Sequence, residues 1–461
     1  MATLREPQLM ATTSASIPHR PYPPSSSPTA PGRPSPTPSP TPPPTSATPA
    51  GVPAGTSDSV AALPSGIRAL AYVVKGNLWV RTAAAPLPRR LTDDGRVSRP
   101  RLSATGKWVA YCRDGVLFAN STAGFAEQTF GQCSGAAWSP VADVLAFLTP
   151  AGQVLLGEVG DGWRIRSLPG HDVVGDIVWK PDGRAVAFVE ESLIGGLDSS
   201  NCPLRAVVLK RTSIDGTSTT ELVAVPRPSG YGLIAAAWTR DAVLYFIVPV
   251  FSSSLTADGT QLMAVPAGGG TPRLVVDDML THADYLSVSP DGRRLAAVEG
   301  GGRYTWTYDK QLTVVNPSTG TRRRLTSTGD IALSPTWSPD GLWLAFGKQP
   351  DVGDDGDSEF HWSLTGQRRI WRIRPDGSGL RQLTHDTAYR DESPHWSSDS
   401  RNILFVRVDK AMQSGSLWAV AVAGGEPIRL AGCLGAAGDA GEGWGWGYYG
   451  HIDWSDVFDL R

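Results

Sequence analysis

The sequence predicts an all-β fold, a β-propeller over residues 66–461, and three observations lead to this prediction. A short phrase, an apolar or aromatic residue followed by Ser-Pro-Asp-Gly or a degenerate copy of it, recurs roughly every 40 to 60 residues. Apolar segments of strand length flank the copies, and no segment shows a helical period. Glycine and proline are abundant, at 51 and 38 of 461 residues, as many tight turns require.

The clearest copies of the phrase are Trp337–Gly341, Ser289–Gly292 and Trp179–Gly183, and weaker copies begin at Trp138, Trp238 and Trp396. Proline presets its own φ in such a turn, and glycine takes the position that needs a positive φ. We expect the aromatic residue before the turn to pack between neighbouring sheets. Small residues on the following strand let those sheets approach closely; they are Ala146, Ala187, Ala297 and Ala345.

One complete unit shows the order of its strands. The segments Pro335–Trp337, Trp343–Phe346, Arg369–Ile373 and Leu380–Thr384 are all of strand length and are separated by turns or an insertion. Four consecutive antiparallel strands of this kind make one propeller blade.

The two ends of the repeat region predict how the ring closes. Ala69–Val74 already resembles a second strand, so the first blade lacks its innermost strand, whereas Ile452–Ser455 is a first strand without a blade. We expect the C-terminal strand to complete blade one, which removes exposed sheet edges. Eight blades follow, or seven if the degenerate unit Pro100–Phe130 merges with a neighbour.

Residues 1–65 form a tract rich in proline, serine and threonine, with few large apolar side chains. Such a tract cannot bury enough surface to offset the entropy of ordering, so it is predicted to be a disordered tail or a stalk. Met1–Pro18 lacks the basic and apolar regions of a signal peptide. No apolar window is long enough to span a membrane.

Charge and cysteine spacing exclude several classes of function. The formal net charge is −2, which gives no overall signal for binding nucleic acid or an anionic membrane. The cysteines, Cys112, Cys133, Cys202 and Cys433, lack CxxC spacing. We expect unpaired or structural thiols, although one or two bridges remain open in an exported protein.

The repeat, Trp/Val-Ser-Pro-Asp-Gly-x-x-Leu-Ala-Phe with Leu-Trp/Thr-Val and Arg-x-Leu-Thr after it, resembles that of TolB-type propellers. A similar repeat forms the propeller of prolyl oligopeptidase and dipeptidyl peptidase relatives. The resemblance covers most of residues 66–461 and implies an extracytoplasmic bacterial setting, periplasmic, cell-surface or secreted. The stalk agrees with that setting, but without a visible leader a cytoplasmic location stays open. The repeat brings no ligand residues with it.

The sequence favours a non-enzymatic binding scaffold of the cell envelope. Gly131–Gly135 places Cys133 where a nucleophile elbow needs serine, no HExxH motif occurs, and the propeller leaves no room for a hydrolase domain. Long insertions predict that one rim of the propeller presents a protein- or glycan-binding face. They are Ser192–Pro203, Phe251–Gly259, Gly300–Asp309 and Gln349–Gln367.

The alternative is a lyase or hydrolase of acidic sugars with a metal, histidine and arginine site at the channel mouth. Polar residues before the innermost strands could converge there on a ligand, although such residues also hydrogen-bond strand ends. The candidates are His171, Asp172, His282, Asp284, His385, Arg390, Asp391 and His451.

An acidic loop is a candidate calcium site, since calcium prefers carboxylates on a flexible loop that contains glycine. Its candidate ligands are Asp351, Asp354, Asp355, Asp357 and Glu359. The spacing does not match the EF-hand pattern, so a solvated acidic loop is the simpler interpretation, and no other cofactor is expected.

Overall fold

The computed structural model describes residues 61–124, 127–160, 162–197, 203–226, 231–249, 259–301, 309–351, 366–409, 415–434 and 451–461. These residues belong to one compact unit that spans Val60–Arg461. Residues 1–60 of the predicted tail therefore lie outside the described residues. Residues 61–65, which we assigned to that tail, make contacts with the unit: Ser65 Oγ donates to Asp399 Oδ2 at 2.7 Å.

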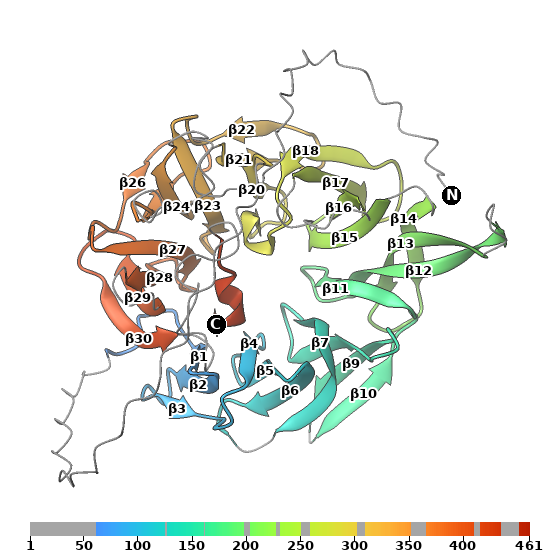
Figure 1. Cartoon of the computed structure of the whole chain (residues 1–461), viewed down its shortest axis with the longest axis horizontal. Helices are drawn as coiled ribbons and strands as arrows, with labels where there is room; N and C mark the ends of the chain where they lie inside the picture. Colours follow the sequence, from blue (N-terminus) through green and yellow to red (C-terminus); the bar gives the residue numbers. More distant parts are fainter. Residues whose placement is uncertain are drawn as a thin grey trace, which may run out of the picture. The chain divides into compact units, whose positions relative to one another are not determined.

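The described part of the chain is almost entirely antiparallel β-sheet (Figure 1). The only helices within it are the short 3₁₀ turns η1 (Ala283–Tyr285) and η2 (Trp454–Asp456).

The strands form six sheets. Four sheets have four strands each: β11 (Val173–Trp179), β12 (Ala185–Leu197), β13 (Pro203–Ser213) and β14 (Thr219–Pro226); β15 (Tyr231–Trp238), β16 (Ala242–Pro249), β17 (Thr260–Pro266) and β18 (Arg273–Met279); β19 (Leu286–Val288), β20 (Leu295–Glu299), β21 (Gln311–Val315) and β22 (Arg322–Arg324); β23 (Asp330–Trp337), β24 (Leu344–Pro350), β25 (Arg369–Ile373) and β26 (Arg381–Gln382).

The other two sheets are larger. A seven-stranded sheet contains β4 (Val97–Leu102), β5 (Trp108–Arg113), β6 (Val116–Ser121), β7 (Gln128–Trp138), β8 (Val144–Leu148), β9 (Val154–Val159) and β10 (Trp163–Ser167). An eight-stranded sheet contains β27 (Tyr389–Trp396), β28 (Asn402–Asp409), β29 (Gly415–Ala421), β30 (Ile428–Leu434), β1 (Ala69–Val74), β2 (Asn77–Thr82), β3 (Arg89–Arg90) and β31 (Phe458–Leu460).

The repeated phrase builds the turn between the first two strands of a unit. Ser338 Oγ donates to Asp340 Oδ1 at 2.6 Å, and the same oxygen accepts from Leu342 N at 3.0 Å. Gly341 closes the turn with φ of +70° and donates its N–H to Ser338 O at 2.8 Å. Serine, aspartate and glycine each have a separate task in this turn, which explains why they recur together.

Indole hydrogen bonds join neighbouring four-stranded units at the ends of several first strands. The tryptophan before the turn is buried, and its Nε1 donates to a backbone oxygen of the first strand of the preceding unit. These bonds join Trp138 to Arg101, Trp179 to Ala137, Trp337 to Ser287 and Trp396 to Thr336, at 2.9 to 3.0 Å. The prediction that this aromatic residue packs between sheets is confirmed.

The C-terminal residues pair with the first strand of the described chain. β31 is antiparallel to β1, with Leu460 opposite Leu70 and Phe458 opposite Tyr72. The prediction of a strand at Ile452–Ser455 is therefore wrong in position, because the strand lies at Phe458–Leu460, further along the chain. Asp453 Oδ1 accepts from Ser455 N at 3.0 Å, and this cap turns the chain into η2 before the strand begins.

A disulfide joins Cys112 on β5 to Cys133 on β7, 21 residues apart in the sequence. The expectation of unpaired thiols is wrong for these two residues. The spacing did not reveal the pair because β6 lies between the two strands and brings both cysteines to the same end of the sheet. Cys433 is free and exposed.

Replacing Cys112 and Cys133 with serine should lower the free energy of unfolding by about 3 kcal/mol, because the bond restricts a loop of that length in the unfolded chain. Chemical denaturation with and without reductant measures this loss. Cys433→Ser is the matched control and should leave the stability unchanged. Equal stability of the double variant and the wild type would contradict a formed bond.

Candidate functional site

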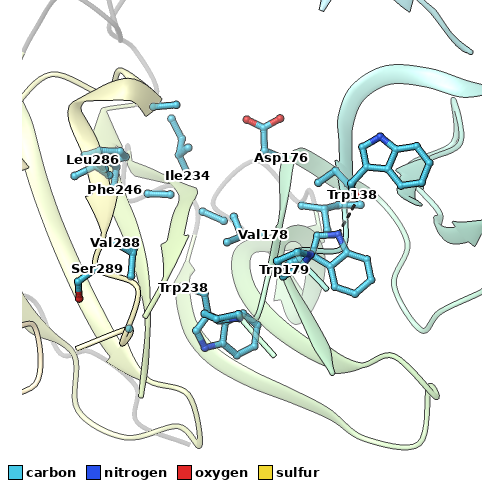
Figure 2. Close-up of a pocket in the computed structure, with 18 of the residues that line it drawn as sticks. Trp138, Asp176, Val178, Trp179, Ile234, Trp238, Phe246, Leu286, Val288 and Ser289 are labelled. Atoms are coloured by element: carbon cyan, nitrogen blue, oxygen red, sulfur yellow. Dashed lines mark hydrogen bonds between the residues drawn. The ribbon is translucent and has the colours of Figure 1, made fainter. Parts of the chain in front are cut away.

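A cavity of about 580 Å³ lies between the first strands of four successive units. Strands β7, β11 and β15 contribute Ala137, Val178 and Ile234, and the segment with η1 and β19 contributes Leu286 and Val288. Figure 2 shows Val178, Ile234, Leu286 and Val288 around the cavity, with Trp238 at one end and Asp176 at the other. A volume of this size falls in the range of ordinary ligand sites.

The local sequence explains why the cavity is open and apolar. Alanines occur on the first strands at positions 137, 235 and 236, and their short side chains leave space between strands. The indoles of Trp138, Trp179 and Trp238 form part of the wall, and Trp179 is held by its bond to Ala137 O (Figure 2). Two residues of the wall, Trp138 and Trp179, thus also form the indole bonds between units.

A second, polar cavity of about 200 Å³ shares Trp138, Asp176 and Ala283 with the first. The C-terminal segment forms one of its sides. Arg101 Nη2 donates to Ser455 Oγ at 2.9 Å. Arg99 Nε lies 3.0 Å from Asp456 Oδ1, and burial raises the pKa of that carboxyl. The two cavities together give a site with an apolar end and a charged end.

Three of the predicted polar residues meet beside this site. His451 Nε2 lies 2.8 Å from Asp284 Oδ1, and Ser334 Oγ donates to Asp284 Oδ2 at 2.6 Å. The rings of His282 and His451 stack, with centroids 3.8 Å apart. This contact ties the C-terminal segment to η1, which is far from it in the sequence.

The two stacked imidazoles have opposite protonation tendencies. Burial, followed by the charge of His451, lowers the pKa of His282 to about 3. The pKa of His451 is raised, because the carboxylate of Asp284 outweighs a burial effect that acts in the other direction. The pKa of Asp284 falls to about 2, because His451 and the other partners outweigh its burial. His451 and Asp284 therefore form an ion pair beside a neutral His282.

The other predicted residues lie elsewhere. Arg390 pairs with Glu392 at 3.1 Å, and both are buried. Asp391 is held by Arg407 through two bonds of 2.7 and 2.9 Å. His171 has a side chain that is 74% exposed and lies 3.5 Å from Asp172. His385 is exposed and lines a separate groove of about 300 Å³ with Lys348 and Trp371.

Only one residue of the predicted calcium loop lies in the described part of the chain. Asp351 Oδ2 accepts from Asp309 N at 3.0 Å, and the negative charge of Asp351 acts to raise the pKa of the buried Lys310. Burial lowers the pKa of Lys310 to about 8. Asp354, Asp355, Asp357 and Glu359 lie outside the described residues, so calcium binding stays a prediction. Among the described residues, no group of three histidine, cysteine or acidic side chains is placed to hold a metal ion.

The apolar cavity was missed at the sequence level. Its lining comes from four first strands, and each strand alone shows only an ordinary apolar pattern. The recurring tryptophan was interpreted as packing between sheets, which is correct but incomplete. The signal that could have found the site is the run of alanines before two of the tryptophans, at 136–137 and 235–237, where the first strands that end at Trp179, Trp337 and Trp396 carry larger residues.

No family model matches the chain. Several curated proteins do match in sequence. A TolB protein of the Tol-Pal system from Novosphingobium aromaticivorans is 36% identical over 83 residues, which are 18% of this chain and 17% of that protein. A TolB homologue from Chlorobium chlorochromatii is 30% identical over 102 residues, 20% of this chain and 22% of that protein.

The repeat is of the TolB type. An uncharacterised protein from Agrobacterium fabrum is 28% identical over 236 residues, 50% of this chain and 64% of that protein. The chain thus spans less than two thirds of the length of each of these TolB-type and related sequences.

Solved structures with a similar arrangement include a putative TolB from Agrobacterium tumefaciens, with a TM-score of 0.38 and 17% identity over 80% of this chain and 91% of that one. An oligogalacturonate lyase in complex with manganese has a TM-score of 0.43 and 16% identity over 75% of this chain and 82% of that one.

In the described part of the present chain, no helix is long and apolar enough to cross a bilayer.

Replacing Asp284 with asparagine should lower the pKa of His451 below its usual value of 6.5, because burial, the largest effect, is then opposed only by the smaller effects of Asp453 and Glu392. NMR titration of the imidazole resonances measures this change. Ser334→Ala removes a hydrogen bond to the same carboxylate but keeps its charge, so the pKa of His451 should stay raised. An unchanged pKa of His451 in D284N would show that the ion pair does not form.

The same variant should change the pH dependence of stability. The pKa of His451 is raised on folding, so its contribution is complete below the unfolded-state value and is lost as pH rises through the folded-state value. The difference in Tm between wild type and D284N should therefore shrink as the pH rises from the ordinary histidine value of 6.5 into the alkaline range. A difference that grows over this interval would have the wrong sign.

Proposed function

We propose that the chain is a non-enzymatic binding scaffold of the bacterial cell envelope, and that the apolar cavity receives a segment of a polypeptide partner. The observation that carries this proposal is the wall of the cavity. Among the residues that line it, Asp176, Thr281 and Ser289 are the main polar side chains, and the rest are largely apolar or aromatic. A wall of this kind suits the apolar side chains of an inserted segment.

The lining favours a polypeptide over a glycan. Sugar hydroxyls need many hydrogen-bond partners, and stacking on a sugar needs an open aromatic face. In this cavity Trp138, Trp179 and Trp238 are no more than 9% exposed. A protein segment with one or two large apolar anchors, as at the centre of many interfaces, fits better.

The proposed architecture is a ring of eight blades closed by the C-terminal strand. Two observations support it. β31 lies against β1 and supplies the strand that the first unit lacks. β7 pairs with β6 through its first residues and with β8 through its last ones, so it serves as both the fourth strand of one unit and the first strand of the next.

An extracytoplasmic location completes the proposal. The TolB-type repeat supports it, because one similar protein is a TolB of the Tol-Pal system. The bond between Cys112 and Cys133 supports it independently, because disulfides persist in oxidising compartments and are rare in the cytosol of mesophiles.

Two earlier hypotheses stay predictions. Most of the predicted rim insertions and of the calcium loop lie outside the described residues, so a protein- or glycan-binding rim keeps its sequence support only. The sugar lyase hypothesis needs histidines that converge. His171 and His385 are exposed at other places, whereas His282 and His451 stack on each other.

A photo-crosslinking amino acid at Val178 or at Ile234, which lie on adjoining strands of the cavity wall, should capture the same polypeptide from an envelope extract. The same probe at Leu87, which is 74% exposed, is the control and should not capture it. Mass spectrometry identifies the captured chain. No adduct at either wall position, or the same adducts from all three positions, would contradict a polypeptide site in the cavity.

A further inference from the structure

Three guanidinium groups meet at the outer edge of the sheet β23–β26, away from the residues that line the apolar cavity. Arg372 on β25 lies directly opposite Arg381 on β26. The Cζ atoms of Arg372 and Arg374 lie 3.9 and 4.3 Å from the ring centroid of Trp343. Two of the three cations therefore share one indole, and the third is the cross-strand neighbour of the first.

Carboxylates do little to balance this charge. Within the described residues, none of the three arginines has an ion pair. Asp376 is the acidic group of the adjoining turn, but its Oδ1 already accepts from the hydroxyl and the N–H of Ser378, at 2.7 and 2.9 Å. The backbone oxygen of Asp376 accepts a further guanidinium, that of Arg323, at 2.8 Å.

Holding these groups together is unfavourable for the folded chain. Like charges directly opposite each other on neighbouring strands are destabilising. Burial, and then the charges of Arg381 and Arg374, lower the pKa of Arg372. Nε of Arg372 is buried and has no hydrogen-bond partner among the described residues. The chain therefore keeps three repelling cations and an unused donor at one place.

The repeat itself supplies the comparison that makes this arrangement unusual. In each of three units, a threonine hydroxyl at the end of the unit accepts an N–H from the third strand. The donors are Leu78, Leu312 and Ile370, so these three residues occupy equivalent positions. Two residues further on, Val80 faces Arg89 and Val314 faces Arg323.

In another unit, Ala264 faces Arg273 in the same way. An arginine on the fourth strand is thus common to several units, opposite an apolar residue on the third strand. Only in the sheet β23–β26, among these four pairs, is that apolar residue replaced by an arginine, Arg372.

Glycines keep the surroundings of the cluster open. A Cβ at Gly424 would lie 2.7 Å from Nη2 of Arg381, and a Cβ at Gly379 would lie 3.0 Å from the ring of Trp343. Both glycines have positive φ, of +91° and +68°. A side chain at either position would therefore displace a member of the cluster.

We propose that Arg372, Arg374 and Arg381 form a binding site for a phosphate group, carried by a lipid headgroup or free in solution. Guanidinium groups bind such oxyanions through paired N–H donors, and stacking on an indole holds the plane of the donors in place. A phosphate with up to two negative charges relieves the repulsion among three cations. This site is separate from the apolar cavity and does not depend on the proposed function.

Thermal unfolding and calorimetric titration of the full chain with sodium phosphate, against sodium chloride of the same ionic strength, test the proposal. Phosphate should raise the Tm of the wild type. In Arg372→Val, which carries the residue of an equivalent unit, the affinity for phosphate should fall about tenfold. Arg273→Gln removes one charge from another sheet, at the fourth-strand position equivalent to Arg381, and should keep wild-type affinity.

Sedimentation with vesicles distinguishes the two sources of the phosphate. Binding to phosphatidylglycerol vesicles, with loss in R372V and little binding to phosphatidylcholine vesicles, would identify a lipid headgroup. Binding of inorganic phosphate alone would identify a soluble ligand. The proposal is overturned if phosphate and chloride act equally on the wild type and no vesicles bind, or if R372V binds phosphate as tightly as the wild type.

Discussion

The indole hydrogen bond between neighbouring units is the interaction on which the rest of the structure depends. A twisted four-stranded sheet has two faces, and each must be covered by another sheet. The tryptophan at the end of the first strand covers apolar surface with its ring and fixes the distance to the preceding unit with its Nε1. One residue thereby supplies both burial and register. Because several units repeat this contact, the first strands lie side by side, and the cavity forms between them.

The sequence was sufficient for the strands and the turns, because both depend on neighbours in the chain. The carboxylate of Asp340 accepts its hydrogen bonds within its own turn, and Trp337 indicates the packing between units. The position of the last strand could not be predicted to the residue. Ile452–Ser455 has the pattern of a strand, but the cap at Asp453 acts over two residues and starts a 3₁₀ turn instead.

The candidate site was much less predictable, since its residues come together only through contacts distant in the sequence. Asp284 and His451 were both selected as polar residues near a strand, yet nothing in their local sequence shows that they form a pair. Arg390 and Asp391 were selected on the same grounds and instead form buried pairs with Glu392 and Arg407. The sequence also could not distinguish an aromatic residue that only packs from one that also lines a cavity.

The C-terminal segment connects the fold to the candidate site. Its strand lies against β1, its 3₁₀ turn lines the polar cavity, and His451 reaches Asp284. Trp454 donates its Nε1 to Glu392 Oε1 at 2.6 Å, so even this segment is joined to another unit through an indole. The C-terminal residues that add a strand to the first unit therefore also shape the polar end of the site.

Hydrogen exchange of the indole N–H groups tests the central claim most directly. In NMR spectra with assigned indole resonances, the Nε1 protons of Trp138, Trp179, Trp337 and Trp396 should exchange only with global unfolding, because each bond joins two units of the repeat. Trp238 is the internal comparison, since it is 3% exposed but its Nε1 has no partner among the described residues. Its N–H should exchange faster than the other four. Exchange of all five at the same rate, well above that of global unfolding, would contradict sheets held together by these bonds.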